Sequence, residues 1–230
     1  MSERFFLATP PHDGRAVLAG DEARHLARVM RCAVGDEVVV FDGSGTSWRA
    51  RVAAIGRDEV ALEIGSVSGG DGRSRVPLTV AVALPKGERQ KWLVEKLTEL
   101  GVERLVPLIT VRGVAEATPA ACERLARGVI EACKQCGRDG LMQIGAARGV
   151  ADLARALAGD ALLMVADRDG EPLDAAAVGE RPVVAFVGPE GGFTAEELAA
   201  VEAAGGRRVS LGPHVLRVET AAIALAARLA

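Results

Sequence analysis

Two short stretches near the C-terminal end decide the fold of this chain: Val187-Gly-Pro-Glu-Gly-Gly-Phe193 and Leu211-Gly-Pro-His-Val-Leu-Arg-Val-Glu-Thr-Ala221. Each stretch follows a short apolar run, at 183–187 or 208–211, and leads into a helix-like segment. This order places both loops at the carboxyl ends of consecutive strands, where open α/β sheets bind small ligands. Glycine lets backbone approach a ligand and proline fixes the loop shape, so we expect a preformed pocket built mainly from main-chain groups.

Earlier apolar runs extend the same pattern toward the N-terminus. Continuous apolar runs are typical of strands covered on both faces, and they occupy residues 78–84, 105–109 and 161–166. Helical patterns alternate with these runs. The first is the stripe of Leu93, Leu97 and Leu100, and the fourth is the segment that begins at the Thr194-Ala-Glu-Glu197 capping box. The other helical segments are residues 121–136, 151–157 and 217–230. The alternation predicts an α/β domain with a mainly parallel sheet over residues 73–230.

The first 72 residues show a different pattern of apolar runs and turns. Strand-like runs at 38–41, 47–53 and 60–64 are short, and Asp42-Gly-Ser-Gly45 is a hairpin turn signal between the first two. This pattern predicts a small β-barrel domain over residues 1–72. The small and polar residues at 66–75 are typical of a linker.

A helix is expected at residues 21–30, ahead of these strands. Helical spacing places Leu26, Val29 and Met30 toward the core. Three guanidinium groups follow an i, i+4, i+7 row on another face, at Arg24, Arg28 and Arg31. Such a row suits phosphate contact, and the alternative is a solvated helix face balanced by neighbouring acids.

Composition narrows the class of protein. The formal net charge of −3 does not suggest a generic nucleic-acid binder, so any RNA-binding surface must be a local patch. The chain opens without an apolar segment of signal-peptide length, and no later apolar run is long enough to cross a bilayer, so we expect a cytoplasmic protein without a membrane partner. Cys133 and Cys136 form a Cys-x-x-Cys motif, but no second pair or suitably spaced His completes a zinc site, so no metal is expected.

The common nucleotide-binding fingerprints are missing. Ala83-Leu-Pro-Lys-Gly-Glu-Arg89 stands after the first strand of the α/β domain, where a Rossmann fold would carry Gly-x-Gly-x-x-Gly. No loop ends in Gly-Lys-Ser/Thr either, so neither a standard dinucleotide site nor a P-loop is expected. A pocket near the last two strands fits a site that holds an adenosine-containing ligand by backbone groups.

The two C-terminal loops carry a resemblance to a known family. Gly188-Pro-Glu-Gly-Gly-Phe-Thr194 together with Leu211-Gly-x-x-x-Leu-Arg-x-Glu-Thr-Ala221 resembles the paired signature of the 16S ribosomal RNA uridine N3-methyltransferases, within the knotted SPOUT methyltransferases. The resemblance extends over nearly the whole chain through Arg4-Phe-Phe-Leu7, His25-Leu-x-x-Val-Met-Arg31, Leu84-Pro-Lys-Gly-Glu88 and Gln135-Cys-Gly-Arg138. Gly-Pro-Glu-Gly-Gly alone recurs in related enzymes, but the combination is highly specific.

The resemblance implies a fold, a cofactor and a substrate. The N-terminal part is expected to be a PUA-like barrel, and the C-terminal α/β domain is expected to contain a deep trefoil knot. The implied assembly is a homodimer, and the implied methyl donor is S-adenosylmethionine. The family methylates N3 of a single uridine in the 16S rRNA of the small ribosomal subunit.

Site residues follow from the resemblance where the motifs match. The residues expected to surround the cofactor are Leu163, Val187, Gly188, Pro189, Glu190, Gly191, Gly192, Leu211, Gly212, Val215 and Leu216. Glu190 is either an electrostatic neighbour of the cofactor's sulfonium or an acceptor that stabilises its own loop. The residues expected to hold RNA are Arg4, Arg24, Arg28, Arg31, Lys86 and Arg89, with solvated surface charge as the alternative for the last two.

Methyl transfer to N3 requires loss of the uracil imide proton. Arg217 is expected to stabilise the charge that develops on a uracil oxygen, and Glu219 to act as a base or to orient Arg217. The alternatives are that Arg217 only binds phosphate and that Glu219 caps the last helix. His214 stands where the family often has a basic residue, so a charge at this position is weaker or pH-dependent.

Two other functions stay open from the sequence alone. A SPOUT enzyme can methylate a ribose 2'-hydroxyl or another RNA position, although the barrel and the Leu-Pro-Lys-Gly stretch favour uridine N3. The chain can also be an RNA-binding or ribosome-assembly module without catalysis, and the intact Gly-Pro-Glu-Gly-Gly and Leu-Arg-x-Glu-Thr motifs argue against this.

Overall fold

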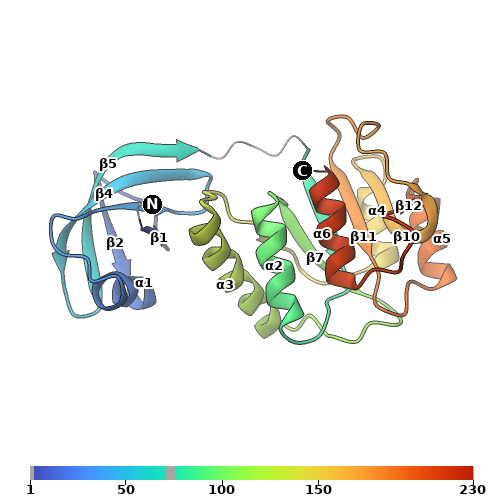
Figure 1. The fold of residues 1–230 in the computed structure, drawn as a ribbon, viewed down its shortest axis with the longest axis horizontal. Coiled ribbons are helices and arrows are strands. Elements are labelled where there is room, and N and C mark those ends of the chain that lie inside the picture. Colours follow the sequence, from blue (N-terminus) through green and yellow to red (C-terminus); the bar gives the residue numbers. More distant parts are fainter. Residues whose placement is uncertain (1–2, 71–75, 230) are drawn as a thin grey trace. The chain divides into compact units, whose positions relative to one another are not determined.

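The computed structural model describes residues 3–70 and 76–229 (Figure 1). The chain divides into two compact units, and each is described by itself. The first contains residues 1–72 and 130–141, and the second contains residues 73–129 and 142–230. Part of the expected linker, at 71–75, lies outside the described residues.

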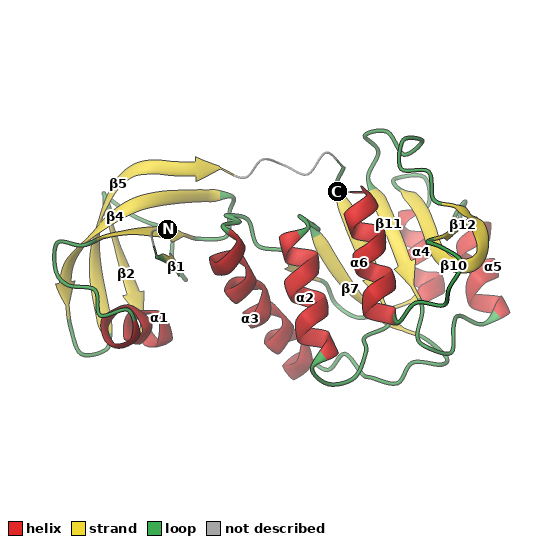
Figure 2. Ribbon diagram, viewed as in Figure 1, coloured by secondary structure: helices red, strands yellow, loops and turns green. Residues whose placement is uncertain are grey.

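The first unit is a curled five-stranded sheet with the strand order β1-β3-β4-β5-β2 (Figure 2). The strands are β1 (Arg4–Phe6), β2 (Arg15–Ala19), β3 (Glu37–Phe41), β4 (Thr46–Ile55) and β5 (Glu59–Gly70). The predicted hairpin is confirmed, because β3 and β4 pair antiparallel across a turn in which Gly43 and Gly45 have φ values of 83° and 97°. The core of this sheet is apolar, with Phe5, Leu18 and Val40 among its buried side chains.

The glycine-rich segment expected as a linker is partly strand. Residues 66–70 belong to β5, where Gly69 pairs with Ser47 of β4. A Cβ atom on Gly69 would lie 3.3 Å from the Asp139 carboxylate and 3.4 Å from Ser47 Oγ. The linker expectation was therefore wrong for 66–70, because small residues here make room for a close contact between polar side chains.

The helix expected at residues 21–30 is also different. It begins as α1 (Gly20–Arg24) and continues as a π-helical segment, η1 (His25–Val29), in which the Met30 N–H donates to His25 O at 3.0 Å. Leu26 is buried as expected, but Val29 is 66% exposed because the wider π-helical winding changes which side chains face the core. The expected α-helical row of Arg24, Arg28 and Arg31 is likewise not formed.

Residues 130–141 complete the first unit. The Arg4 guanidinium pairs with the Asp139 carboxylate and also donates to Arg138 O at 3.3 Å. Ser47 Oγ donates to Asp139 Oδ2 at 3.0 Å, and Lys134 Nζ donates to Glu22 Oε1 at 2.8 Å. This packing of a distant segment against the strands was not predicted.

The second unit contains a parallel sheet with the order β12-β10-β11-β6-β7-β8, and β9 also pairs with β7. The strands are β6 (Leu78–Val82), β7 (Arg104–Ile109), β8 (Gln143–Ile144), β9 (Arg148–Gly149), β10 (Leu162–Pro172), β11 (Val183–Val187) and β12 (Arg207–Ser210). All of these pairings are parallel, so the predicted parallel α/β architecture is confirmed.

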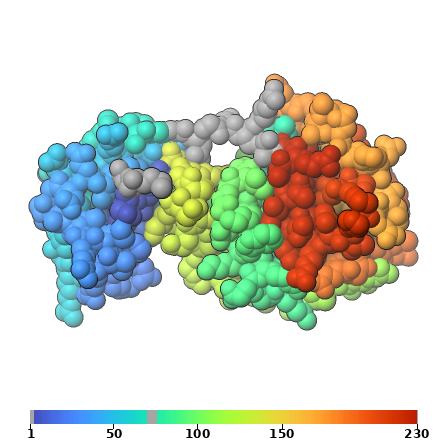
Figure 3. All heavy atoms as spheres, viewed as in Figure 1, coloured from blue at the N-terminus to red at the C-terminus, as the bar shows by residue number. Residues whose placement is uncertain are grey.

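Helices cover both faces of this sheet, which explains why its strands are continuously apolar. The helices of this unit are α2 (Arg89–Glu99), α4 (Val150–Leu157), α5 (Ala195–Ala203) and α6 (Val218–Leu229). Helix α3 (Pro119–Cys136) begins in this unit, and its residues from 130 onward belong to the first. Figure 1 shows α2 and α6 in front of the sheet, with α4 and α5 behind it. In Figure 3 the red surface of the C-terminal residues meets the green surface that includes α2.

Strand β10 is longer than the apolar run that predicts it. Val209 of β12 pairs with Ala166 and again with Glu171, so the residues between them bulge out of the ladder. A Cβ atom on Gly170 would lie 2.6 Å from the backbone of Arg208 and Val209, so only glycine fits. In the sheet, β10 also separates β11 from β12, although these two are consecutive in the chain.

Candidate active site

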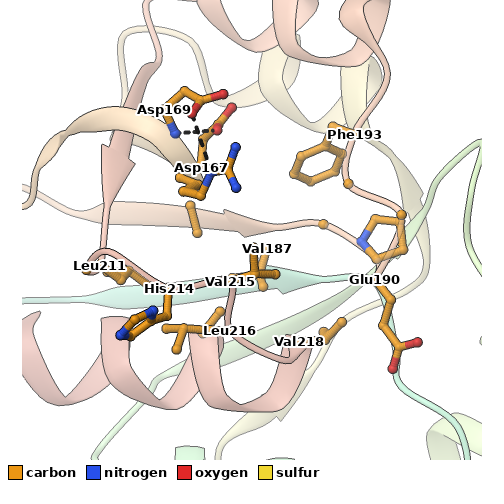
Figure 4. Close-up of a pocket in the computed structure, with 18 of the residues that line it drawn as sticks. Asp167, Asp169, Val187, Glu190, Phe193, Leu211, His214, Val215, Leu216 and Val218 are labelled. Carbon is orange, nitrogen blue, oxygen red and sulfur yellow. Dashed lines mark hydrogen bonds and ion pairs between the residues drawn. The ribbon is translucent and has the colours of Figure 1, made fainter.

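The carboxyl ends of β10, β11 and β12 enclose one cavity of about 480 Å³ (Figure 4). Parallel neighbouring strands end at the same edge of a sheet, so the loops that follow them converge there. The loop after β11 and the loop after β12 are the two stretches on which the sequence analysis centres. The volume lies within the usual range of small-molecule and cofactor sites, roughly 300–1,000 Å³.

Nearly all of the predicted cofactor residues line this cavity. The lining includes Val187, Gly188, Pro189, Glu190, Gly191, Gly192, Leu211, Gly212, Val215 and Leu216. Leu163 is placed elsewhere, because it is buried in the apolar cluster that β10 shares with α4 and α5. His214 also lines the cavity, and it is exposed.

Backbone geometry explains the glycines of the loop after β11. The Gly192 N–H donates to Pro189 O at 2.8 Å and closes a tight turn, and Gly192 has φ of 69°. A Cβ atom on Gly188 would lie 3.0 Å from the Phe193 ring. Side chains at these positions would strain the turn or displace the ring, so the loop keeps its main-chain groups close to the cavity.

Two contacts fix this loop from outside. Arg112 Nη1 donates to Gly191 O at 2.7 Å. The predicted capping box at the start of α5 is confirmed, because Thr194 and Glu197 each accept from the other's backbone N–H, at 3.2 and 2.8 Å. Glu197 also contacts the loop after β7, because its Oε1 accepts a hydrogen bond from the Val111 N–H at 2.9 Å. The second half of the loop is therefore held by contacts with the loop after β7 and with the start of α5.

Sequence reasoning missed a third wall of the cavity, formed by residues 166–169 of β10. Asp167 and Asp169 lie there beside Phe193 (Figure 4). The Asp169 N–H donates to Asp167 Oδ1 at 2.9 Å, and Asp167 Oδ2 lies 3.7 Å from Arg208 Nη1. The available signal was two acids directly after an apolar strand, where carboxyl-end residues meet a ligand.

A charged cluster beside the cavity joins the first turns of α2 and α6 to the loop after β11. Arg89 Nη1 donates to Glu190 Oε1 at 2.6 Å and lies 3.8 Å from Glu219 Oε2. The hydrogen bond from Arg89 is the main cause that lowers the pKa of Glu190, and the charges of Arg89, Arg217 and Lys86 add to it. Figure 4 shows the Glu190 carboxylate turned away from Val187, so in this structure it stabilises its own loop.

Glu219 differs from the other acids of this cluster because it is buried. Its side chain is 5% exposed, and its Oε2 has no hydrogen-bond partner among the described residues. Arg217 is exposed and lies two residues earlier, and Val218 between them lines the cavity. The two predicted catalytic residues therefore flank a residue of the cavity wall.

The predicted RNA contacts are spread over both units. Arg28 and Arg31 are exposed, as is Lys86 in the loop after β6. The others have partners inside the protein: Arg24 pairs with Asp21, Arg4 with Asp139 and Arg89 with Glu190. Within residues 3–70 and 76–229, no group of three or more His, Cys, Asp or Glu could hold a metal ion, and no helix is long and apolar enough to span a membrane.

Comparisons with known proteins bear on this geometry. The profile of the family described as RNA methyltransferase domain matches residues 72–230, and that of the RNA methyltransferase PUA domain matches residues 18–65. Ribosomal RNA small subunit methyltransferase E of Mycobacterium tuberculosis is 34% identical over 95% of this chain and 87% of its own length. The chain belongs to the ribosomal RNA small subunit methyltransferase E family. The Synechocystis member is 33% identical, over 91% of this chain and 70% of its own.

Solved structures of similar sequence show the same architecture. A putative methyltransferase from Legionella pneumophila, in complex with the bound cofactor SAM, has a TM-score of 0.90 at 26% identity, covering 100% of this chain and 97% of that one. Ribosomal RNA small subunit methyltransferase E from Neisseria gonorrhoeae, bound to S-adenosyl methionine, has a TM-score of 0.88 at 28% identity, covering 99% and 96%. The expected combination of a PUA-like barrel with a parallel α/β domain is confirmed for this member of the family.

Proposed function

We propose that this chain transfers a methyl group from S-adenosylmethionine to N3 of a uridine in the 16S rRNA of the small ribosomal subunit. One observation carries the proposal: residues 166–169 of β10 and the loops after β11 and β12 enclose one cavity, and Arg217 and Glu219 flank its wall at Val218. Membership of the ribosomal RNA small subunit methyltransferase E family supports rRNA methylation. The N3 position rests on the resemblance of the two loop motifs.

The cavity fits S-adenosylmethionine in size and in chemistry. Main-chain groups of Gly188–Gly192 are available to an adenine edge, and Leu211 and Leu216 offer apolar contacts. The carboxylates of Asp167 and Asp169 suit a ligand that carries a sulfonium and an ammonium group. When bound, this cofactor supplies an electrophilic methyl group.

The protein's own residues then have to prepare the uracil. The N3–H proton must leave before N3 can accept a methyl group, and the buried Glu219 carboxylate is the proposed acceptor of that proton. The electron pair left on N3 is delocalised onto the uracil oxygens. Arg217 is exposed next to the cavity wall, and its guanidinium is proposed to donate to one of these oxygens and stabilise the charge.

The test is methylation of small subunits that lack the modification, with Arg217→Ala compared with the unchanged protein at saturating cofactor. We expect turnover to fall by about 100-fold, the usual cost of removing one donor to a developing oxyanion. The affinity for the cofactor, measured by calorimetry, should change less than about twofold, because Arg217 is proposed to contact the uracil and not the cofactor. Arg155→Ala is the control, because Arg155 belongs to the same unit and its ion pair with Asp152 is exposed.

Other outcomes would redirect the proposal. Normal turnover of Arg217→Ala would remove this residue from the reaction. Mass mapping that finds the methyl group on a ribose 2'-hydroxyl would support the alternative SPOUT activity. Absence of heat on addition of the cofactor would support a module that binds RNA without catalysis.

From the resemblance we further infer that the two parts of the chain have different functions. Residues 1–72 are proposed as the RNA-binding domain and residues 73–230 as the methyltransferase domain, with a deep trefoil knot. The phosphate contacts proposed are those of Arg28, Arg31 and Lys86, and of Arg24, whose pair with Asp21 is exposed. Arg4 and Arg89 are less exposed and pair with Asp139 and Glu190. The enzyme is proposed to act as a cytoplasmic homodimer.

A further inference from the structure

We propose that Arg89 is a positioning residue that holds both the Gly188–Gly192 loop and the Glu219 carboxylate through one guanidinium nitrogen. The inference rests on the proposed function, because it assigns a role toward the cofactor loop and the proposed proton acceptor. It gives Arg89 a task different from the phosphate contact that the resemblance implies.

The geometry of Arg89 carries the first part of this inference. Arg89 is the first residue of α2, and its Nη1 lies 2.6 Å from Glu190 in the loop after β11 and 3.8 Å from Glu219 in α6. The turn that presents Arg89 is itself braced, since Gln90 Nε2 donates to Pro85 O at 2.8 Å and the Gln90 N–H donates to Gly87 O at 3.1 Å. One side chain therefore joins the start of α2, the loop after β11 and the first turn of α6.

The burial of Glu219 carries the second part. A buried carboxylate is costly unless a cation or hydrogen-bond donors compensate it. Among the described residues, Arg89 is the cation within 4.0 Å of Glu219, and Glu219 Oε2 accepts no hydrogen bond. The short hydrogen bond of the same nitrogen goes to the exposed Glu190 instead. Glu219 is thus charge-compensated by Arg89, and its buried Oε2 accepts no hydrogen bond from the described residues.

Double-mutant cycles distinguish a positioning residue from an RNA contact. A residue that acts through Glu190 and Glu219 loses its effect when those two carboxylates are neutralised. A phosphate contact keeps its effect in both backgrounds, because the phosphate is still present. Arg89→Ala is therefore combined with Glu190→Gln in one double-mutant cycle and with Glu219→Gln in a second.

The first cycle measures cofactor affinity by calorimetry, with S-adenosylmethionine as the titrant. We expect Arg89→Ala to raise the Kd by about threefold, since Glu190 and Arg89 are partly exposed and screened. The same substitution should change the Kd by less than about 1.5-fold in the Glu190→Gln background. Arg89→Lys keeps a cation for Glu190 and should recover most of the affinity.

The second cycle measures the urea midpoint of the cofactor-free protein, which needs no enzymatic activity. Arg89→Ala should lower the midpoint, because it leaves the Glu219 charge buried and uncompensated. Adding Glu219→Gln should restore the midpoint, because the charge is then removed. Arg155→Ala serves as the control and should leave both the midpoint and the Kd unchanged.

The results separate this inference from the proposed function. Additive effects in both cycles, or a raised KM for small subunits as the main effect of Arg89→Ala, would overturn the positioning role. Failure of the unchanged protein to methylate small subunits would instead overturn the proposed function. The urea cycle stays interpretable in that case.

Discussion

At the scale of the residue, Glu190 shows how the state of one carboxyl group is set by its neighbour. It lies on the loop that lines the cavity, yet its carboxylate is directed to Arg89. The resulting hydrogen bond holds the pKa of Glu190 below its ordinary value of 4.5. A carboxyl group with a lowered pKa stabilises the folded state above its unfolded pKa, and this contribution is lost as pH falls through the folded pKa.

We therefore predict that the contact between Arg89 and Glu190 is complete at neutral pH and opens only in acid, below pH 4.5. NMR titration of the Glu190 carboxyl carbon should show a midpoint below the ordinary glutamate value. In Arg89→Ala the midpoint should rise, because the main cause of the lowered pKa is removed. Equal midpoints in the two proteins would show that Arg89 does not control this group.

At the scale of the element, helix α5 and the loop after β7 are both held by the side chain of Glu197. Glu197 accepts from the Thr194 N–H and from the Val111 N–H, so it caps α5 and holds the chain after β7. We predict that Glu197→Ala speeds amide hydrogen exchange at Val111 and lowers the free energy of unfolding by about 1 kcal/mol or more.

Glu196→Ala is the matched control for this prediction. Glu196 lies in the same first turn of α5, so it has a similar interaction with the helix dipole. It does not accept from Val111, so exchange at that amide should stay as in the unchanged protein. Faster exchange in both variants would assign the effect to the helix as a whole.

The elements that the sequence predicts well are those with a strong periodic or capping signal. Strand β11 is fully buried and apolar, and α5 begins at the capping box, so both are recognised locally. The polar half of β10 and the glycine-rich end of β5 are strands because their backbones pair with neighbouring strands. Their sequences carry no apolar pattern from which a strand could be predicted. The π-helical segment at residues 25–29 has the composition of an ordinary helix, so its winding was also missed.

The candidate site follows the same rule. The two Gly/Pro loops were predictable because each carries its own motif beside an apolar run. The wall at Asp167 and Asp169 carries only the weaker signal of two acids after an apolar strand, and its place beside the two loops depends on β10 lying between β11 and β12 in the sheet. Strand order is a long-range property that no local pattern specifies.

At the scale of the whole molecule, the most demanding feature is a buried network that joins residues far apart in the chain. Asp139 is 5% exposed, and it accepts hydrogen bonds from Arg4 and Ser47. We predict that Asp139→Ala lowers the free energy of unfolding of the first unit by roughly 3 kcal/mol, because it leaves the Arg4 charge without its partner. Urea unfolding followed by Trp48 fluorescence in a Trp92→Phe background measures this change, since Trp48 packs against the core of that unit and Trp92 lies in the other.

Glu37→Ala is the control within the same unit. Glu37 pairs with Arg51 at 3.3 Å, but both side chains are more than half exposed. Its removal should cost less than about 1 kcal/mol. A similar loss of stability in the two variants would contradict the prediction that the buried hydrogen bonds of Asp139 stabilise this unit more than an exposed ion pair does.

The dependence of the N-terminal barrel on residues 130–141 has a consequence for the newborn chain. All five barrel strands leave the ribosome before the segment that carries Asp139 and Lys134 has been translated. At bacterial elongation rates of 5–20 residues per second, the interval between them lasts roughly 3–14 s. During that delay Arg4 and Glu22 lack their partners Asp139 and Lys134. We therefore expect the barrel to complete its buried ion pairs only after residues 130–141 have been synthesised.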